Sequence, residues 1–302
     1  MKVWIPHEAG LSLLGTPPDG VELEVFGGHD LPSDPATVEV WAPPFLVDPN
    51  TAALLDKMRS LRLVQLLSAG ADAWVGRVRY GITLCDARGV HDSSTAEWAI
   101  TAILAHLREF PRFVRAQAGR EWAFGPTDEL AGKRVLIVGH GSIGAALERR
   151  LVPFDATVTR VARRPRDGVH DAEELPRLLP DADVVVLLVP LTPRTAGLVN
   201  AAFLAAMHDG ALLVNAARGP VVDTAALTAE VSTGRLNAAL DVTEPEPLPA
   251  DHPLWTMPNV LLTPHVAGAV MGLLPRAYRL VGEQLRRYAP AEPLANVVTD
   301  GY

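Results

Sequence analysis

The sequence predicts an α/β protein with two doubly wound parallel-sheet domains, and three observations indicate this fold. The chain has 302 residues, more than one hydrophobic core usually spans. Short apolar runs alternate with polar or helical stretches along its whole length. A Gly-x-Gly-x-x-Gly loop, Gly139 to Gly144, follows one apolar run and opens a helical pattern. Two α/β domains are therefore expected, one of them of the Rossmann type.

Five apolar runs in the first part of the chain predict strands of a parallel sheet. They are residues 2–5, 21–25, 38–41, 61–67 and 81–84. Asp48-Pro49-Asn50 precedes a helical stretch that ends near Met58. Apolar residues at helical spacing behind a Ser-Ser-Thr start predict one long helix over about 93–118, joining two domains.

Strand and helix patterns alternate again after the loop at 124–127. Strands are predicted near 134–138, 157–161, 183–189, 211–214, 236–241 and 259–262. The third of these is an unbroken apolar run, typical of a strand covered on both faces, and Pro190 ends it where ligands usually bind. A last helix is predicted over about 272–288, and the pattern alone leaves open whether it returns to the first domain.

Composition limits the classes of partner. The 35 acidic and 27 basic residues give a net charge of −8, which disfavours nucleic acid and anionic lipid as partners. No apolar run approaches the length needed to cross a bilayer. Cys85 is the one cysteine, so no internal disulfide can form, and we interpret it as a small buried hydrophobe. We expect a cytoplasmic protein without a membrane or nucleic-acid partner.

The glycine loop has a specific physical interpretation. Gly139 allows a tight turn, Gly141 lets the backbone approach a pyrophosphate, and Gly144 lets the helix pack against the strand. The pyrophosphate is expected on the free N–H groups at the helix start. His140 is interpreted as a solvent-facing position of this loop.

The end of the second strand indicates which nicotinamide nucleotide is bound. An NAD site usually has an acidic residue there, whereas this chain has Ala162 followed by arginines, of which Arg163 and Arg164 come first. Guanidinium groups can pair with a 2′-phosphate. We therefore predict a preference for NADP(H), with NAD(H) as the second cofactor. The alternative is an exposed basic turn with no ligand.

Three ionisable residues each come just past a predicted strand: Arg218, Glu246 and His265. Their positions place them on the ligand-binding edge of a parallel sheet. Such a set suits hydride transfer to a 2-keto acid: a fork for the carboxylate, a proton donor for the carbonyl oxygen, and a carboxylate that keeps the donor charged. Glu244 is the nearest competitor for the acidic role. No His, Cys or Asp cluster has metal-ligand spacing, so no metal is expected.

Several motifs together make the chain similar to the D-isomer-specific 2-hydroxyacid dehydrogenase family, particularly its glyoxylate/hydroxypyruvate reductase branch. The motifs are the glycine loop, Leu191-Thr192-Pro193 with Thr195, Asn215-x-x-Arg218-Gly219, Leu240-Asp241-Val242 with Glu246-Pro247, and Pro264-His265. The resemblance covers nearly the whole chain. It implies a flavodoxin-like substrate domain, 1–95 and 275–302, with a Rossmann cofactor domain, 96–274, inserted in it. It also implies an active site in the cleft and a homodimer.

The resemblance implies roles for individual residues. Arg218 would bind the substrate carboxylate, and His265 would donate a proton with Glu246 beside it. Backbone N–H groups of Ala69 and Gly70 would hold the carboxylate. Asp241 would bind the nicotinamide carboxamide. The remaining implied cofactor contacts are Thr95, Gly139, His140, Gly141, Ser142, Ile143, Gly144, Val189, Pro190, Thr195, Ala216 and His265.

The sequence departs from the family pattern in two places. Val266-Ala267-Gly268-Ala269 differs from the family's usual residues after the catalytic His, which alters the pocket, and Ala162 shifts cofactor choice.

Three alternative functions are considered. One alternative is a nucleotide-sensing binding protein on the same scaffold, which Arg218, Glu246 and His265 disfavour. A formate-type dehydrogenase fits poorly, because a neutral amide is expected beside the His in that group. A phosphite dehydrogenase can use a similar trio.

Overall fold

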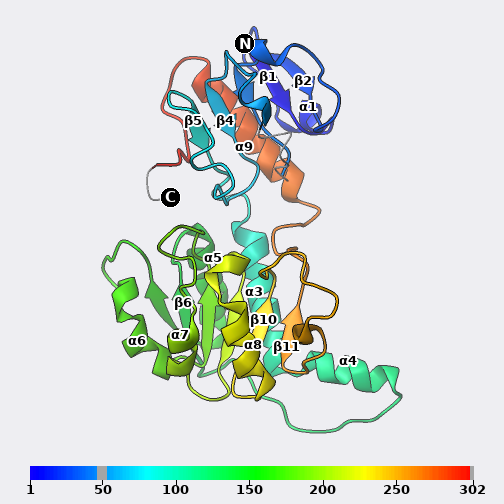
Figure 1. Cartoon of the computed structure of the whole chain (residues 1–302), viewed down its shortest axis with the longest axis vertical. Coiled ribbons are helices and arrows are strands. Elements are labelled where there is room, and N and C mark those ends of the chain that lie inside the picture. Colours follow the sequence, from blue (N-terminus) through cyan, green and yellow to red (C-terminus); the bar gives the residue numbers. More distant parts are fainter. Residues whose placement is uncertain (46–52, 300–302) are drawn as a thin grey trace. The chain divides into compact units, whose positions relative to one another are not determined.

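The chain divides into two compact units in the computed structural model, which describes residues 1–45 and 53–299 (Figure 1). The first unit contains Met1–His91 and Val270–Tyr302, and the second contains Asp92–Ala269. The second unit is thus an insertion within the first. Its bounds lie four residues before position 96 and five before position 274, the limits expected from the sequence.

Five parallel strands form the sheet of the first unit, in the order β2-β1-β3-β4-β5. Their bounds are β1 Lys2–Ile5, β2 Glu22–Val25, β3 Val40–Trp41, β4 Leu63–Gln65 and β5 Thr83–Cys85. This order is flavodoxin-like, as predicted, and each strand lies within one residue of an expected apolar run. The short helices α1 (Gly10–Leu13) and η1 (Pro35–Thr37) lie in the connections.

The last helix, α9 (Leu273–Tyr288), returns to the first unit, a point that the sequence pattern left open. Its buried face, including Tyr278 and Val281, packs with Val3 and Ile5 of β1. Cys85 is buried in the same cluster, and burial raises the pKa of its thiol to about 12. The interpretation of Cys85 as a buried hydrophobe is confirmed.

Six parallel strands form the sheet of the second unit, in the order β11-β10-β9-β8-β6-β7. Their bounds are β6 Arg134–Val138, β7 Thr157–Val161, β8 Val184–Leu187, β9 Leu212–Asn215, β10 Asn237–Leu240 and β11 Val260–Leu262. The chain places β7 on one side of β6 and β8 on the other, so the strand order reverses at β6. A ligand is expected at the carboxyl ends of strands at such a reversal.

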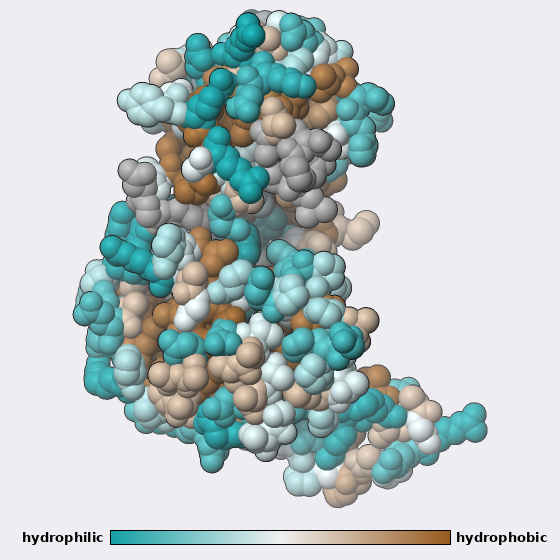
Figure 2. All heavy atoms as spheres, viewed as in Figure 1, coloured by the Kyte–Doolittle hydropathy of each residue, from teal (hydrophilic) through white to brown (hydrophobic). Residues whose placement is uncertain are grey.

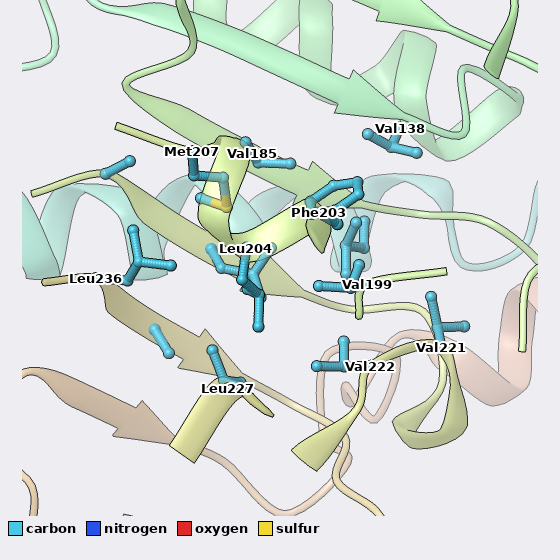
Figure 3. Packing of buried hydrophobic residues seen from close by; sticks show 14 of the residues in the cluster. Val138, Val185, Val199, Phe203, Leu204, Met207, Val221, Val222, Leu227 and Leu236 are labelled. Atoms are coloured by element: carbon cyan, nitrogen blue, oxygen red, sulfur yellow. The ribbon is translucent and has the colours of Figure 1, made fainter. Parts of the chain in front are cut away.

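Both faces of this sheet are covered, which is why β8 is apolar at every position. Val184 and Val186 pack with α3 (Asp92–Leu107) and α5 (Ser142–Leu151). Val185 and Leu187 face the opposite cluster (Figure 3). That cluster includes residues of α6 (Leu175–Leu178), α7 (Ala201–Ala206) and α8 (Thr224–Ser232). The remaining short helices are η2 Val152–Phe154, η3 Ala172–Glu174, η4 Leu179–Asp181, η5 Gly219–Val221 and η6 Pro253–Trp255.

The single long helix predicted over 93–118 is wrong, because the structure has two helices there, α3 and α4 (Phe110–Ala118). Glu109 between them has φ 50°, the left-handed region. Pro111 lacks the N–H that would continue the helix by bonding to Leu107 O, and this carbonyl accepts from Asp128 N at 3.0 Å instead. The periodicity is correct for both parts, but the proline separates them.

Two further expectations need qualification. Strand β8 ends at Leu187, three residues before Pro190, although Leu188 N still donates to Val138 O. The helical stretch expected after Asp48-Pro49-Asn50 begins at positions that lie outside the described residues. Within the described part, no helix is long and apolar enough to span a bilayer.

Candidate active site

The three ionisable residues singled out in the sequence follow three neighbouring strands. Arg218 follows β9, Glu246 follows β10 and His265 follows β11, and these strands are consecutive in the sheet. All three strands are parallel, so their following segments leave from the same edge. The sheet therefore brings Arg218, Glu246 and His265 to one edge of the second unit, the edge at which ligands bind in such folds.

His265 and Glu246 are in direct contact. The Nδ1 atom of His265 lies 2.7 Å from Oε1 of Glu246, and the two side chains are 46% and 42% exposed. A carboxylate accepts, so this contact assigns the Nδ1 proton to the imidazole and leaves Nε2 to face a ligand. Glu244, the competing acid, is exposed, and its backbone carbonyl accepts from Thr224 Oγ1. The structure thus brings Glu246, and not Glu244, to the histidine.

The backbone at His265 is strained and is held in place by Asp241. His265 has φ 55°, a left-handed conformation that costs on the order of 1 kcal/mol for a residue with a Cβ. The His265 N–H donates to Asp241 O at 2.7 Å. The buried Asp241 carboxylate accepts from Thr263 Oγ1 and from the N–H groups of Val266 and Ala267. Asp241 therefore orients the histidine loop; its predicted contact with a carboxamide stays a prediction.

The Arg218 loop packs closely on the Glu246 loop. Asn215 holds the turn by accepting from Ala217 N at 3.0 Å and donating to Arg218 O at 3.2 Å. A Cβ at Gly219 would overlap the carbonyl of Thr243. Only glycine allows this approach, so the Asn-x-x-Arg-Gly pattern places Arg218 beside the segment that carries Glu246.

The glycine loop has the geometry that its three glycines predict. Gly139 has φ 109°, and a Cβ there would overlap Leu188 backbone atoms. A Cβ at Gly144 would lie 2.8 Å from Gly139 O, so only glycine lets α5 pack so near β6. By contrast, a Cβ at Gly141 would meet no atom within 4 Å. The space at Gly141, in front of the α5 N–H groups, fits a pyrophosphate.

Comparisons with known proteins show the family of the chain. Residues 100–267 match the family model described as "D-isomer specific 2-hydroxyacid dehydrogenase, NAD binding domain". This match covers more than half of the chain. The chain belongs to the D-isomer specific 2-hydroxyacid dehydrogenase family. It is therefore an oxidoreductase with a nicotinamide-nucleotide-binding domain, as predicted from the motifs.

Members of this family with known names or structures resemble the chain over most of its length. Glyoxylate reductase of Thermofilum pendens is 35% identical over 80% of this chain and 75% of its own. A family member from Xanthobacter autotrophicus, solved with NADPH and MES, is 33% identical over 99% of this chain and 97% of its own, with a TM-score of 0.84. An NADPH-dependent glyoxylate/hydroxypyruvate reductase from Sinorhizobium meliloti, solved with NADP and sulfate, is 28% identical over 98% of each chain, with a TM-score of 0.84.

The solvent-facing position expected for His140 within this family's glycine loop is wrong. Its side chain is only 10% exposed, and Nε2 lies 2.8 Å from Oε2 of Glu148. Arg166 Nη2 lies 3.1 Å from His140 Nδ1 and 2.9 Å from His140 O. Arg160 also donates to Glu148, through Nε at 2.8 Å and through Nη2. Three side chains, Arg160 of β7, Arg166 of the loop after it and Glu148 of α5, therefore hold the glycine loop through these contacts.

The sequence did not predict the parts that Arg166, Arg160 and Glu148 take in this network, and Arg166 shows why. It belongs to the same basic run as Arg163 and Arg164, and nothing in the spacing of the run distinguishes it. In the structure a turn formed by the Arg166–Val169 bridge brings its guanidinium back over the glycine loop. Arg163 and Arg164 are exposed after β7, where they can meet a cofactor phosphate.

Glu148→Gln should lower the free energy of unfolding by about 1–3 kcal/mol at neutral pH, because it removes charge-assisted hydrogen bonds. The hydrogen bonds from Arg160, and then His140, hold the Glu148 pKa below its ordinary value. Because the pKa of Glu148 is lower in the folded than in the unfolded protein, its ionised form stabilises the fold. This stabilisation is fully present above the unfolded-state pKa of about 4.3, and it is lost as the pH falls through the folded-state pKa. The difference between wild type and variant should therefore shrink in acid.

Urea unfolding at several pH values measures this effect, with Glu129→Gln as the control. Glu129 is an exposed glutamate of the same unit, and no ion pair of its side chain is found among the described contacts. An equal loss of stability at neutral and acidic pH in Glu148→Gln would contradict the assigned charge network.

The other predicted cofactor positions lie in loops after the strands. Thr195 Oγ1 donates to Pro190 O at 2.6 Å and accepts from Thr192 N at 2.8 Å, which shapes the loop that contains Val189. Ala216 follows β9, and Ser142 and Ile143 begin α5. Ser142 Oγ donates to Asp92 Oδ1 at 2.9 Å. Contacts of these positions with a cofactor stay predictions.

Residues predicted at the hinge and in the first unit have local partners of their own. Thr95 is buried in α3, near the boundary between the units. Ala69 and Gly70 follow β4 and are partly exposed. Ser68 Oγ donates to Gly70 O at 2.8 Å, and His91 Nε2 lies 2.8 Å from Leu67 O, so this loop is held at both ends. Among the residues described, no group of three His, Cys, Asp or Glu side chains could hold a metal ion.

Proposed function

We propose that this chain reduces small 2-keto acids with NADP(H), and that glyoxylate and hydroxypyruvate are its first candidate substrates. The observation that carries the proposal is the 2.7 Å contact between His265 Nδ1 and Glu246 Oε1 at the carboxyl edge of the sheet. A nucleotide-sensing protein needs cofactor contacts but no proton donor with a carboxylate behind it. The glyoxylate and hydroxypyruvate reductases among the relatives support the substrate class.

Each of the three side chains has a separate role in the proposed reaction. When bound by the glycine loop, the reduced dinucleotide would supply the hydride that C2 of the keto acid needs. His265 donates its Nε2 proton to the carbonyl oxygen, which becomes the hydroxyl, and keeps the Nδ1 proton toward Glu246. Glu246 stabilises the imidazolium before that transfer. Arg218 binds the substrate carboxylate through its guanidinium fork. Oxidation of the hydroxy acid runs the same steps in reverse.

A substrate panel tests this proposal. Purified protein should oxidise NADPH in the presence of glyoxylate or hydroxypyruvate, which is measured as loss of the absorbance of the reduced nicotinamide. Their amides, which lack the carboxylate, should react far more slowly. Cofactor binding without turnover of any keto acid would favour the sensing alternative, and turnover of phosphite or formate alone would refute the proposed substrate class.

The cofactor preference rests on Ala162 and on the arginines after it. Ala162 supplies no carboxylate that could bind a ribose 2′-OH, and exposed Arg163 and Arg164 offer guanidinium groups for a 2′-phosphate. Two of the relatives with solved structures contain NADPH or NADP.

Replacing both Arg163 and Arg164 by Ala should weaken NADPH binding about 10- to 100-fold while changing NADH binding less than about threefold. The loss is that of charge-assisted hydrogen bonds to the 2′-phosphate, which are worth about 1.5–3 kcal/mol. Cofactor titration of intrinsic fluorescence measures both constants. The control is Arg149→Ala, since Arg149 is an exposed arginine of the neighbouring helix α5. Equal losses for NADPH and NADH would contradict a 2′-phosphate contact.

A homodimer is proposed from the surface of the second unit. Helix α4 and the segment after it project from this unit with apolar and charged side chains intermixed (Figure 2). Trp122 and Phe124 are 94% and 92% exposed, and Phe110 and Val114 are more than half exposed. Such a set of large apolar side chains is typical of a protein interface. A cytoplasmic location likewise stays a prediction.

The double substitution Trp122→Ser with Phe124→Ser should convert a dimer into a monomer, because it removes two aromatic anchors from the surface. Sedimentation equilibrium measures the mass of each protein. Tyr80→Ser is the control, since Tyr80 is fully exposed in the first unit. A monomeric wild type, or a double variant that stays dimeric, would contradict dimerisation through this surface.

A further inference from the structure

His7 is a partly exposed histidine at the carboxyl end of β1 whose ring is held from one side. Its Nδ1 atom lies 2.9 Å from the hydroxyl oxygen of Tyr278, and its own backbone N–H donates to the same oxygen at 3.1 Å. The ring of Tyr278, fully buried in α9, meets that of His7 edge-on at 5.9 Å. A buried side chain therefore orients this imidazole.

These contacts determine which ring nitrogen carries the proton. The Tyr278 hydroxyl accepts from the His7 N–H, and its own proton has no other acceptor among the described residues than Nδ1. Nδ1 must then accept, so the neutral ring has its proton on Nε2. Burial lowers the pKa of His7, and burial raises the pKa of Tyr278, so both groups stay neutral near pH 7.

The Nε2–H of His7 is a donor without a partner in the part of the chain that the structure describes. Within residues 1–45 and 53–299, no acceptor lies within hydrogen-bond distance of Nε2. The ring faces Phe45, which follows β3, with 6.1 Å between ring centroids. A donor of fixed position beside an aromatic ring suits recognition of a polar group on a small ligand.

His7 shares its sheet edge with the loop predicted to hold the substrate carboxylate. Strands β1 and β4 are parallel and both lie next to β3, so their carboxyl ends are about 10 Å apart. The loop with Ala69 and Gly70 follows β4. A three-carbon keto acid whose carboxylate is held by the Ala69–Gly70 loop could therefore reach the His7 imidazole with its other end.

We propose that His7 is a specificity-determining residue of the substrate site, whose Nε2–H donates a hydrogen bond to an oxygen on C3 of the 2-keto acid. The preferred substrates are then keto acids with a hydroxyl at C3, such as hydroxypyruvate, over those with a plain methyl group, such as pyruvate. This inference rests on the proposed function and adds to it which part of the substrate is recognised.

Hydroxypyruvate and pyruvate differ only in the C3 hydroxyl, so their kcat/KM ratio isolates the proposed contact. In His7→Ala this ratio should fall about tenfold, which is the contribution of about one hydrogen bond. The kcat/KM for hydroxypyruvate should fall, and the kcat/KM for pyruvate should change little. Tyr278→Phe should lower the ratio in the same direction, because it frees the tautomer while keeping the ring. His7→Gln, which retains an N–H donor, should restore part of the ratio.

His29→Ala is the matched control, because His29 is an exposed histidine of the same unit, and its ratio should equal that of the wild type. If the wild type reduces both acids and the ratio is unchanged in His7→Ala and Tyr278→Phe, the role of His7 is refuted and the proposed function stands. If His7→Ala fails to fold, Tyr278→Phe and His7→Gln decide in the same way. A wild type that reduces neither acid overturns the proposed function, and this inference with it.

Discussion

His265→Ala should lower kcat for keto acid reduction about 10²- to 10⁴-fold, the usual contribution of a general acid. Cofactor affinity should change little, because the substitution leaves the glycine loop and its locking network untouched. The variant lacks the imidazole that we propose as the proton donor to the carbonyl oxygen. Steady-state rates with saturating NADPH, together with a fluorescence titration of NADPH, separate the two quantities.

His170→Ala is the matched control for this experiment. His170 also pairs with a glutamate, Glu174, at 3.1 Å in the second unit, but it lies between β7 and η3 and not at the site edge. Its loss should leave kcat unchanged. Glu246→Gln should give an intermediate loss, because the imidazolium keeps its proton donor and loses the stabilising carboxylate. A turnover number in His265→Ala equal to that of the wild type would remove this residue from the mechanism.

Arg218→Ala should lower kcat/KM for keto acids about 10²-fold or more, because it leaves the substrate carboxylate without its charged, forked partner. Arg218→Lys should recover only part of this loss, since an ammonium cannot make two parallel hydrogen bonds to a carboxylate. The measurement compares a keto acid with its amide in wild type and variant. The acid should lose most of its advantage over the amide.

The control for Arg218 is again Arg149→Ala, which removes an exposed arginine of the same unit far along α5 from its start. It should preserve the preference for the acid. A similar fall for acid and amide in Arg218→Ala would show that the residue supports the loop and does not bind the carboxylate. The Asn215 hydrogen bonds to this turn would then be the structural reason for the loss.

Much of the fold could be predicted because local patterns and tertiary packing agree. The alternation at Val184 to Leu187 buries residues on both faces of the sheet, and only a strand covered by helices accommodates four apolar residues in succession. Gly139 and Gly144 could be interpreted one by one, because a Cβ at either position would overlap backbone atoms, whereas Gly141 leaves open the space expected for a pyrophosphate. The shared sheet edge of Arg218, Glu246 and His265 could be predicted because each residue follows a strand and parallel strands end at a common edge.

Other features depend on residues far apart in the chain, and no local pattern contains them. Arg166 lies over His140 because a turn redirects it, and Glu148 completes the network from a different helix. The break after Leu107 has its local signal in Pro111, but the carbonyl freed there finds its partner in Asp128.

Periodicity and glycine spacing were enough to predict the fold class and the dinucleotide loop, because each of these is encoded within a few consecutive positions. Only the folded chain shows that Glu246 and not Glu244 contacts His265 and that Asp241 holds the His265 loop. Only the folded chain shows, too, that His7 Nε2–H has no acceptor among the described residues. These depend on hydrogen bonds between segments as distant as His7 and Tyr278. The direction of such a bond is set by the packing of whole elements and cannot be inferred from neighbours in sequence.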